Sequence, residues 1–211
     1  MSLVAPLVRA LVALDAVEVE GLVSDQIVAA GSASISDQLV QPALEEVGAQ
    51  WERGEISLAQ VYLGGRICER VLDSLFPLAA ADGPDDAQVA IAAFQDGHTL
   101  GKRLVTSLLR SAGYRVRDYG QGVGVRDLVA RVRGEPVEVL LLSVLMLRSA
   151  LGVRDLVAAL RAEGLETRVV VGGAPFRLDP KLGLEVGADG WGRTASDALR
   201  LVGEMVGGGG L

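Results

Sequence analysis

The sequence predicts an α/β protein in two parts, an N-terminal four-helix bundle and then a five-stranded parallel sheet with helices on both faces. Apolar residues recur at helical spacing up to residue 82 and gather into short continuous runs after residue 88. The polar stretch 82–87 contains Gly-Pro and separates the two patterns as a linker. After it, strand-like and helix-like segments alternate, which is typical of a parallel sheet covered on both faces. The predicted domains are therefore 1–82 and 88–211.

Helical periodicity defines the elements of the first domain. The apolar spacing predicts helices over residues 7–17, 22–28, 39–51 and 58–75. Ser36 with Asp37, and Ser57, are expected to cap helix N-termini, and Gly54 is expected to end a helix. Four helices with short connections form a small bundle.

The second domain is predicted from a change of period. Strands are expected over residues 89–94, 114–119, 137–145, 168–171 and 188–191. Helices are expected over residues 100–111, 125–132, 153–160 and 195–206. Residues 124–130, Gly-Val-Arg-Asp-Leu-Val-Ala, recur unchanged as residues 152–158. Because the offset matches one strand–helix unit, the repeat indicates two equivalent packing helices.

Composition excludes several classes of protein. The net charge of −7, with no basic cluster, argues against nucleic-acid binding. No uninterrupted apolar run reaches the about 18 residues of a membrane span, so no membrane association is expected. The apolar start has no basic region before it, which argues against a signal peptide. Cys68 is the only cysteine, and we expect it in the core of a cytoplasmic protein.

The chain has one histidine, His98, in the sequence Asp96-Gly97-His98-Thr99-Leu100-Gly101. A carboxylate two residues before an imidazole can fix its tautomer and make it a better metal ligand. With no second histidine and one cysteine, a zinc site made only of protein ligands is almost excluded. A metal bound by His98 would arrive with most of its ligands in place, which points to a macrocyclic cofactor. Taken alone, the motif also fits a loop with a surface histidine.

Three unusual segments lie where predicted strands end. Asp96–Gly101 follows the first strand, Ser143-Val144-Leu145 ends the third, and Gly172-Gly173 follows the fourth. Ligands of open parallel sheets bind beyond the carboxyl ends of the strands. Glycines at this edge allow a backbone to approach a ligand closely. The sequence therefore predicts one binding site at this edge.

These segments carry a resemblance to a known family. Asp96-x-His98-x-x-Gly101, Ser143-x-Leu145 and Gly172-Gly173 resemble, in order and spacing, the cobalamin-binding signature of methionine synthase and its relatives. The helical half is similar to that family's cap module, notably over residues 47–58. A chain of this length with both modules resembles the small corrinoid proteins of methanol, methylamine and methoxyarene methyltransferase systems. The resemblance implies a Rossmann-like, flavodoxin-like second domain and a cobalamin or related corrinoid cofactor.

The resemblance also implies roles for the site residues. His98 would be the lower ligand of cobalt in the base-off, His-on mode, with Asp96 hydrogen-bonded to it. Ser143 would either extend this relay or contact the displaced base. The residues that would line the channel for the nucleotide tail are Gly101, Leu145, Gly172 and Gly173. Gly97, Thr99 and Leu100 of the histidine motif would also contact the cofactor. In the helical domain, Trp51, Leu58, Val61 and Tyr62 match the family's cap contacts or lie one turn beyond them. Taken alone, Trp51 fits the core or surface of a bundle equally well.

The function implied is that of a methyl carrier. Loaded as methylcobalamin, the protein would shuttle a methyl group from a substrate-specific methyltransferase to an acceptor methyltransferase that uses a folate or a thiol. A reductive activation protein would be a third partner, and the chain would not be a complete enzyme alone. A cobalamin-dependent sensor and a cobalamin storage protein are the alternatives. Light-sensing regulators of the family carry Glu-His where this chain has Val61-Tyr62, which favours the carrier.

Overall fold

The computed structural model describes residues 2–30, 35–75, 88–135 and 137–206, and it divides into two compact units, Met1–Leu78 and Ala79–Leu211. Each unit is described by itself. The predicted linker over residues 82–87, and the glycine run 207–210, lie outside the described residues.

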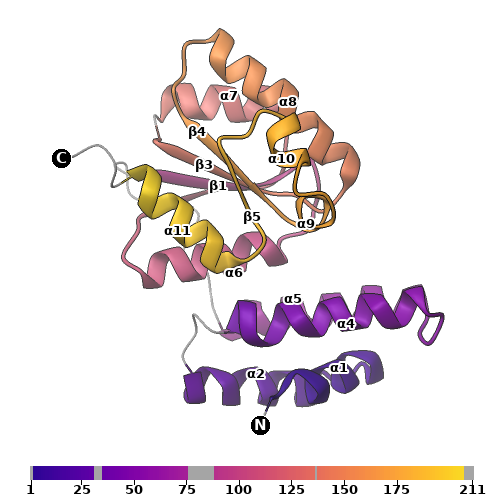
Figure 1. Ribbon diagram of the computed structural model, residues 1–211. Coiled ribbons are helices and arrows are strands. Elements are labelled where there is room, and N and C mark those ends of the chain that lie inside the picture. The colour runs from indigo at the N-terminus through magenta and orange to yellow at the C-terminus, as the bar shows by residue number, and fades with distance from the viewer. Residues whose placement is uncertain (1, 31–34, 76–87, 136, 207–211) are drawn as a thin grey trace. The chain divides into compact units, whose positions relative to one another are not determined.

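The described part of the first unit is helical, as predicted (Figure 1). Its elements are α1 (Val4–Ala13), α2 (Ala16–Ala30), the π-helical segment η1 (Ser36–Val40), α4 (Gln41–Glu52) and α5 (Leu58–Leu75). Helix α1 packs against α2, α4 and α5. Its buried side chains Leu7 and Leu11 recur at the four-residue spacing that the sequence analysis used.

The second unit contains a five-stranded parallel sheet in the order β2-β1-β3-β4-β5. The strands are β1 (Val89–Phe94), β2 (Val116–Val123), β3 (Val139–Ser143), β4 (Arg168–Gly172) and β5 (Gly190–Gly192). Every residue of β1 is buried, because β1 is central and covered on both faces. The order reverses between β1 and β3, and this is the switch point at which such sheets bind ligands.

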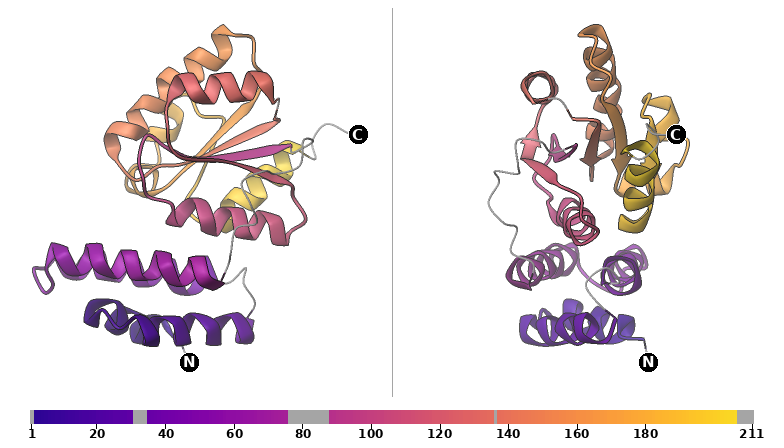
Figure 2. Two further views of the ribbon diagram at one scale, coloured as in Figure 1. Left: turned by 180° about the vertical axis from the view of Figure 1, so that it is seen from behind. Right: turned by 90° about the vertical axis from the view of Figure 1, so that its left-hand side faces the viewer.

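Helices cover both faces of this sheet (Figures 1 and 2). One face carries α7 (Val125–Gly134) and α8 (Leu147–Ala162), which pack against each other, and the other carries α6 (Leu100–Ser111) and α11 (Ala195–Val206), which also pack together. Each face of the sheet has its own apolar cluster. The fold class predicted from the sequence is therefore confirmed.

Some predicted boundaries were wrong. Strand β2 begins at Val116 and runs on to Val123, beyond the predicted end at residue 119. It is an edge strand, and its pairing with β1 shifts register twice after Ile91. In the sequence its glycines suggest a turn, whereas in the structure they lie in a bulge of the strand. Strand β5 is Gly190–Gly192, two residues later than its predicted start.

Three helical segments were not predicted from the sequence, because each gives only a weak apolar period. Helix α8 begins at Leu147, not at residue 153, and its first two residues are exposed, so its buried face starts only at Ser149 and Ala150, two small residues that give a weak apolar signal. The short helices α9 (Ala174–Leu178) and α10 (Leu182–Glu185) give too few residues for a period to be recognised. Within the described residues, no helix is long and apolar enough to cross a membrane.

Candidate functional site

The predicted site residues of the second unit meet at the carboxyl edge of its sheet. The parallel register places Ala93 of β1 beside Ser143 of β3, Ser143 beside Gly172 of β4, and Gly172 beside Gly192 of β5. Strands β3, β4 and β5 therefore end in small residues, and β1 has the small residue Ala93 directly before its last residue. The small residues in this row let neighbouring backbone approach closely, since a Cβ on Gly172 would lie 3.3 Å from the Gly192 carbonyl oxygen.

Asp96 connects two loops at this edge. One carboxylate oxygen, Oδ1, accepts a hydrogen bond from the backbone N–H of His98 at 3.0 Å, and the other, Oδ2, accepts one from the N–H of Leu145 at 3.0 Å. The Asp96 side chain is only 7% exposed. Hydrogen bonds to a carboxylate are stronger than neutral ones, so Asp96 holds the loop after β1 against the loop after β3.

The His98 side chain lies beside this carboxylate and remains open to solvent. Its Nδ1 is 3.7 Å from Asp96 Oδ1, and its side chain is 53% exposed. This separation exceeds hydrogen-bond length, so the imidazole is near the carboxylate without being bonded to it. The imidazole is therefore accessible for a ligand.

Two of the predicted glycines stand where a side chain cannot fit. A Cβ on Gly101 would lie 2.9 Å from Ser143 Oγ, which places the first turn of α6 directly against the end of β3. A Cβ on Gly173 would lie 1.9 Å from the carbonyl oxygen of Val144, and Gly173 has a φ of +118°. The Ser143 hydroxyl thus lies against Gly101, and it makes no hydrogen bond with another described residue. Gly97 is exposed and Thr99 precedes α6, whose Arg103 N–H bonds to the Thr99 carbonyl at 2.9 Å.

Large apolar side chains are exposed on the loop after β3 and on the start of α8. They are Leu145, Met146, Leu147 and Leu151, and each is at least 40% exposed. Leu145 is the residue whose N–H bonds to Asp96. Apolar side chains grouped in this way mark a binding surface more often than isolated ones do.

The predicted cap residues lie in the first unit around the α4–α5 connection. Trp51 is 46% exposed, Leu58 63% and Tyr62 61%, whereas Val61 is half-buried. Leu58 and Tyr62 are four residues apart on α5 and so share a face. The structure therefore presents three of these four side chains to solvent and does not place them in the core of the bundle.

Local hydrogen bonds fix this connection. Gly54, with a φ of +74°, ends α4, as predicted. Ser57 and Gln60 form a reciprocal capping box at the start of α5, with the Gln60 Oε1 accepting from the Ser57 N–H at 3.0 Å and Ser57 Oγ accepting from the Gln60 N–H at 3.3 Å. Hydrogen bonds from Arg53 lower the pKa of the Glu55 carboxyl below its ordinary value.

Sequence reasoning missed Gln95, which directly precedes the motif. It has a φ of +55°, and its N–H bonds to the Val123 carbonyl at 3.2 Å. Its side-chain Oε1 lies 3.0 Å from where a Cβ on Gly152 would stand. Gly152 belongs to the second copy of the heptapeptide repeat, so the two copies are not fully equivalent. The first copy begins before α7 and the second begins inside α8.

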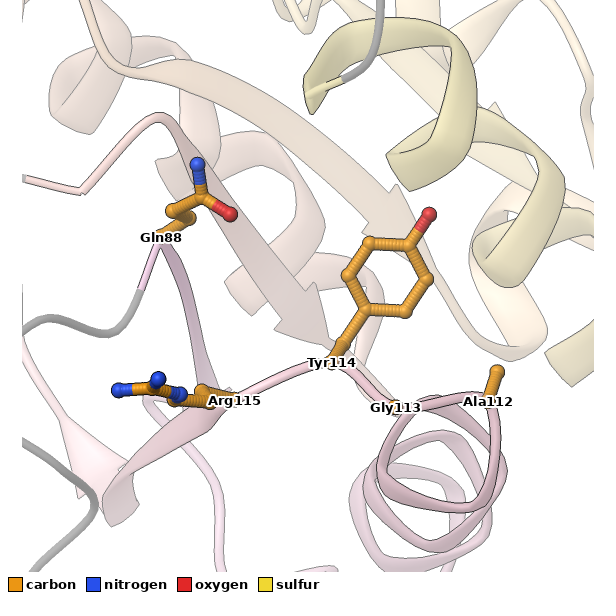
Figure 3. A pocket seen from close by; sticks show the side chains of 5 residues that line it. All are labelled: Gln88, Ala112, Gly113, Tyr114 and Arg115. Atoms are coloured by element: carbon orange, nitrogen blue, oxygen red, sulfur yellow. The ribbon is translucent and has the colours of Figure 1, made fainter.

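A separate hollow of about 430 Å³ lies at the opposite edge of the sheet (Figure 3). Gln88, Ala112, Gly113, Tyr114 and Arg115 line it, and these residues stand at or before the beginnings of β1 and β2. The Tyr114 hydroxyl points toward α11, where it is 3.4 Å from the position of a Cβ on Gly203. This hollow is therefore distinct from the carboxyl edge that carries His98.

Comparison with known proteins identifies the family. One family model, described as a B12 binding domain, matches residues 88–200, and a second of the same description matches residues 3–75. The chain belongs to the B12-binding corrinoid proteins. Dimethylamine corrinoid protein 3 of Methanosarcina mazei is 30% identical over 168 residues, which are 77% of this chain and 99% of that protein. A corrinoid protein of Desulfitobacterium hafniense is 28% identical over 171 residues, 78% of each chain.

A solved corrinoid protein has the same fold over nearly the whole chain. The structure of the Methanosarcina barkeri monomethylamine corrinoid protein matches with a TM-score of 0.77 and 29% identity, covering 93% of this chain and 95% of that one. The cofactor of this B12-binding corrinoid protein is cobalamin or a related corrinoid, as the resemblance implied.

The residues at the carboxyl edge fit such a group. They offer an open imidazole, a row of small residues at the strand ends, and exposed apolar side chains beside them. Within the described residues, His, Cys, Asp and Glu do not gather in any group of three or more that could hold a bare metal ion. A metal bound at His98 would thus take its remaining ligands from the cofactor.

Proposed function

We propose that this B12-binding corrinoid protein is a methyl carrier that binds its cofactor base-off, with His98 as the lower ligand of cobalt. When bound, the cofactor supplies a cobalt that accepts a methyl group from one partner and releases it to another. The observation that supports this proposal best is the exposed His98 imidazole next to a row of small residues at the switch point of the sheet.

Each site residue then has a task in this chain. Asp96 Oδ1 accepts a hydrogen bond from the backbone N–H of His98. The same oxygen is 3.7 Å from Nδ1, so a small rotation of the imidazole would let the ring N–H donate a hydrogen bond to it. Orientation by a carboxylate raises the basicity of a histidine ligand. Gly101, Ser143, Gly172 and Gly173 lie at the strand ends, where backbone segments approach closely, and they would line the path of the displaced nucleotide tail.

The apolar residues would protect the cofactor from water. Leu145 would contact it from the second unit. In the first unit, Trp51, Leu58 and Tyr62 are exposed, and we propose that they shield the reactive upper face of the corrin. A shield of this kind must open for each partner, since the methyl group has to be reached from both.

The partners follow from this role. A substrate-specific methyltransferase would load the carrier, an acceptor methyltransferase acting on a folate or a thiol would unload it, and a reductive activation protein would restore it after oxidation. Two of the relatives named above are methylamine corrinoid proteins, which supports a methylated amine as the donor class. The cytoplasmic location, inferred from the single buried cysteine, stays a prediction.

Because the chain has one histidine, an isotope label on histidine reports on His98 alone. The protein is produced with ¹⁵N-labelled histidine, loaded with cobalamin and reduced to the Co(II) state. If His98 is the axial ligand, the nitrogen splitting of the electron paramagnetic resonance lines changes from the triplets of ¹⁴N to the doublets of ¹⁵N. His98→Ala should lose the His-on visible spectrum, and added imidazole should restore it.

An unchanged spectrum in His98→Ala, or nitrogen splitting unaffected by the label, would refute His98 as ligand. Arg126→Ala, at an exposed position on α7, is the matched control and should behave as the parent protein. Methyl transfer from a methylamine:corrinoid methyltransferase then separates carrier from storage protein, because a storage protein would bind the cofactor without becoming methylated. Light-dependent oligomerisation with adenosylcobalamin would instead indicate a sensor.

A further inference from the structure

A buried ion pair lies close to the His98 loop and has no part in the function proposed so far. Lys102 Nζ is 2.6 Å from both carboxylate oxygens of Asp118, and the two side chains are only 6% and 10% exposed. Lys102 stands in the first turn of α6, directly after Gly101, whereas Asp118 lies on the edge strand β2.

Stability alone does not explain this pair. Removing two charges from water offsets most of their attraction, so an apolar pair of similar volume often stabilises a protein equally well or better. The same unit also contains ion pairs that remain exposed to water, such as Arg133–Glu163 at 2.6 Å. A buried pair does, however, require one specific arrangement of the elements that carry it, because a displaced partner leaves an unpaired charge in the interior.

Lys102 and Asp118 are each connected to the segment that carries His98, one to its C-terminal end and the other to its N-terminal end. On one side, Lys102 anchors the first turn of α6, which follows the loop 95–99, while Gly101 abuts Ser143. On the other side, Asp118 Oδ1 also accepts the N–H of Gly120 at 2.7 Å, at the point where β2 bulges.

Backbone hydrogen bonds connect the bulge of β2 to Asp96 and Gln95. Gly120 and Gly122 have φ values of +89° and +68°, and the N–H of Gly122 donates to the Asp96 backbone carbonyl at 2.8 Å. The next residue, Val123, accepts the N–H of Gln95 at 3.2 Å. Asp118 therefore connects to both ends of the five-residue loop that carries His98.

We propose that Lys102 and Asp118 are positioning residues, and that their buried ion pair holds the loop 95–99 so that His98 is preorganised to ligate cobalt. The effect on cobalt rests on the proposed function, whereas the effect on the loop does not. Partners that orient a ligating histidine typically change metal affinity by about 10–100-fold when removed.

Two measurements test this on the full chain. In the protein without cofactor, Lys102→Met should accelerate hydrogen exchange of the Gly122 and His98 amides by about tenfold or more relative to amides of β3 and β4. In the cobalamin-loaded protein, the same variant should lower the ratio of His-on to His-off forms in the visible spectrum by about tenfold.

Controls separate positioning from simple destabilisation. The double variant Lys102→Met with Asp118→Leu removes both charges, so it should recover the thermal stability lost in Lys102→Met while the loop amides stay fast and the His-on ratio stays low. Leu160→Ala, fully buried near the end of α8 remote from the motif, should lower stability without changing either readout. Arg133→Met, in the exposed pair, should change nothing.

The proposal is overturned if the loop amides of Lys102→Met exchange at the parental rate, or if the double variant recovers the parental exchange rate and His-on ratio. If the parent itself shows no histidine ligation, the proposed function fails, and the exchange measurement still decides whether the pair holds the loop. Normal exchange with a reduced His-on ratio would also contradict the proposal, because the pair would then act by another route.

Discussion

Replacing Gly173 by alanine should disrupt the second unit far more than the same change at another glycine. The added Cβ would stand 1.9 Å from the Val144 carbonyl oxygen, whereas ordinary contacts begin at 3.4 Å, so the two backbones must separate by about 1.5 Å. The Val144 N–H also bonds to the Gly172 carbonyl at 2.9 Å, which resists that separation. At φ +118° and ψ −177° the backbone conformation itself adds about 1–3 kcal/mol for a residue other than glycine. We expect a total loss of more than about 4 kcal/mol.

Gly164 provides the matched control. It has a φ of +68°, with no atom within 4 Å of the position its Cβ would take. Alanine there meets only the left-handed penalty of about 1–2 kcal/mol, partly offset by about 0.4–1 kcal/mol from a less disordered unfolded chain. The net loss should be about 1 kcal/mol.

The assay is equilibrium unfolding in urea followed by tryptophan fluorescence. The chain has two tryptophans, Trp51 in the first unit and Trp191 in the second, so a Trp51→Phe background reports the second unit alone. With a urea slope of about 2 kcal/mol/M, the midpoint should fall by about 0.5 M for Gly164→Ala and by about 2 M or more for Gly173→Ala. Midpoints that agree within about 0.3 M would refute the argument from close backbone approach.

Three further predictions concern single residues. Burial, with a smaller contribution from Glu69, raises the pKa of the Cys68 thiol from 9.0 to about 12, so a thiol reagent at about pH 8 should react only after urea unfolds the first unit. Burial likewise raises the pKa of Tyr119 from 10.0 to about 12, with Glu135 contributing. The folded state thus favours the neutral phenol, and this stabilisation is full below pH 10 and is lost as the pH rises from 10 to about 12, so Tyr119→Phe should show a flatter decline in stability there. Gln95→Gly relieves a left-handed backbone and should raise the urea midpoint of the second unit slightly, by up to about 0.5 M.

Each of these has a clear contrary result. Reaction of Cys68 in the folded protein at the rate of a free thiol would show that the first unit opens readily. Parallel stability curves for Tyr119→Phe and the parent above pH 10 would show that the phenol ionises equally in both states. A lower midpoint for Gln95→Gly would mean that the contact of its side chain with α8 outweighs the backbone strain.

The sequence predicted the order of the large elements because each carries a long or strongly apolar pattern. Strand β1 and helices α6 and α11 agree with their predicted bounds, since β1 is one continuous buried apolar run and the buried residues of the two helices keep one helical period. Strand β2 did not agree, because Asp118, Gly120 and Gly122 interrupt the apolar alternation. Those same residues bind Lys102 and the Asp96 loop, so the pattern is broken where tertiary contacts replace local regularity.

The candidate site divides in the same way. The sequence by itself determined which residue types occur at the strand ends: one histidine, a carboxylate two residues before it, a serine, and a glycine pair. These follow from chain order and the alternation of strands and helices, since parallel strands bring their carboxyl ends to one edge. What only the tertiary structure decided is how they are held. Asp96 accepts a hydrogen bond from the backbone of Leu145, in the loop after the neighbouring strand β3, and the Lys102–Asp118 pair connects a helix to an edge strand. Contacts of this kind join residues distant in sequence, and no local period or spacing encodes them.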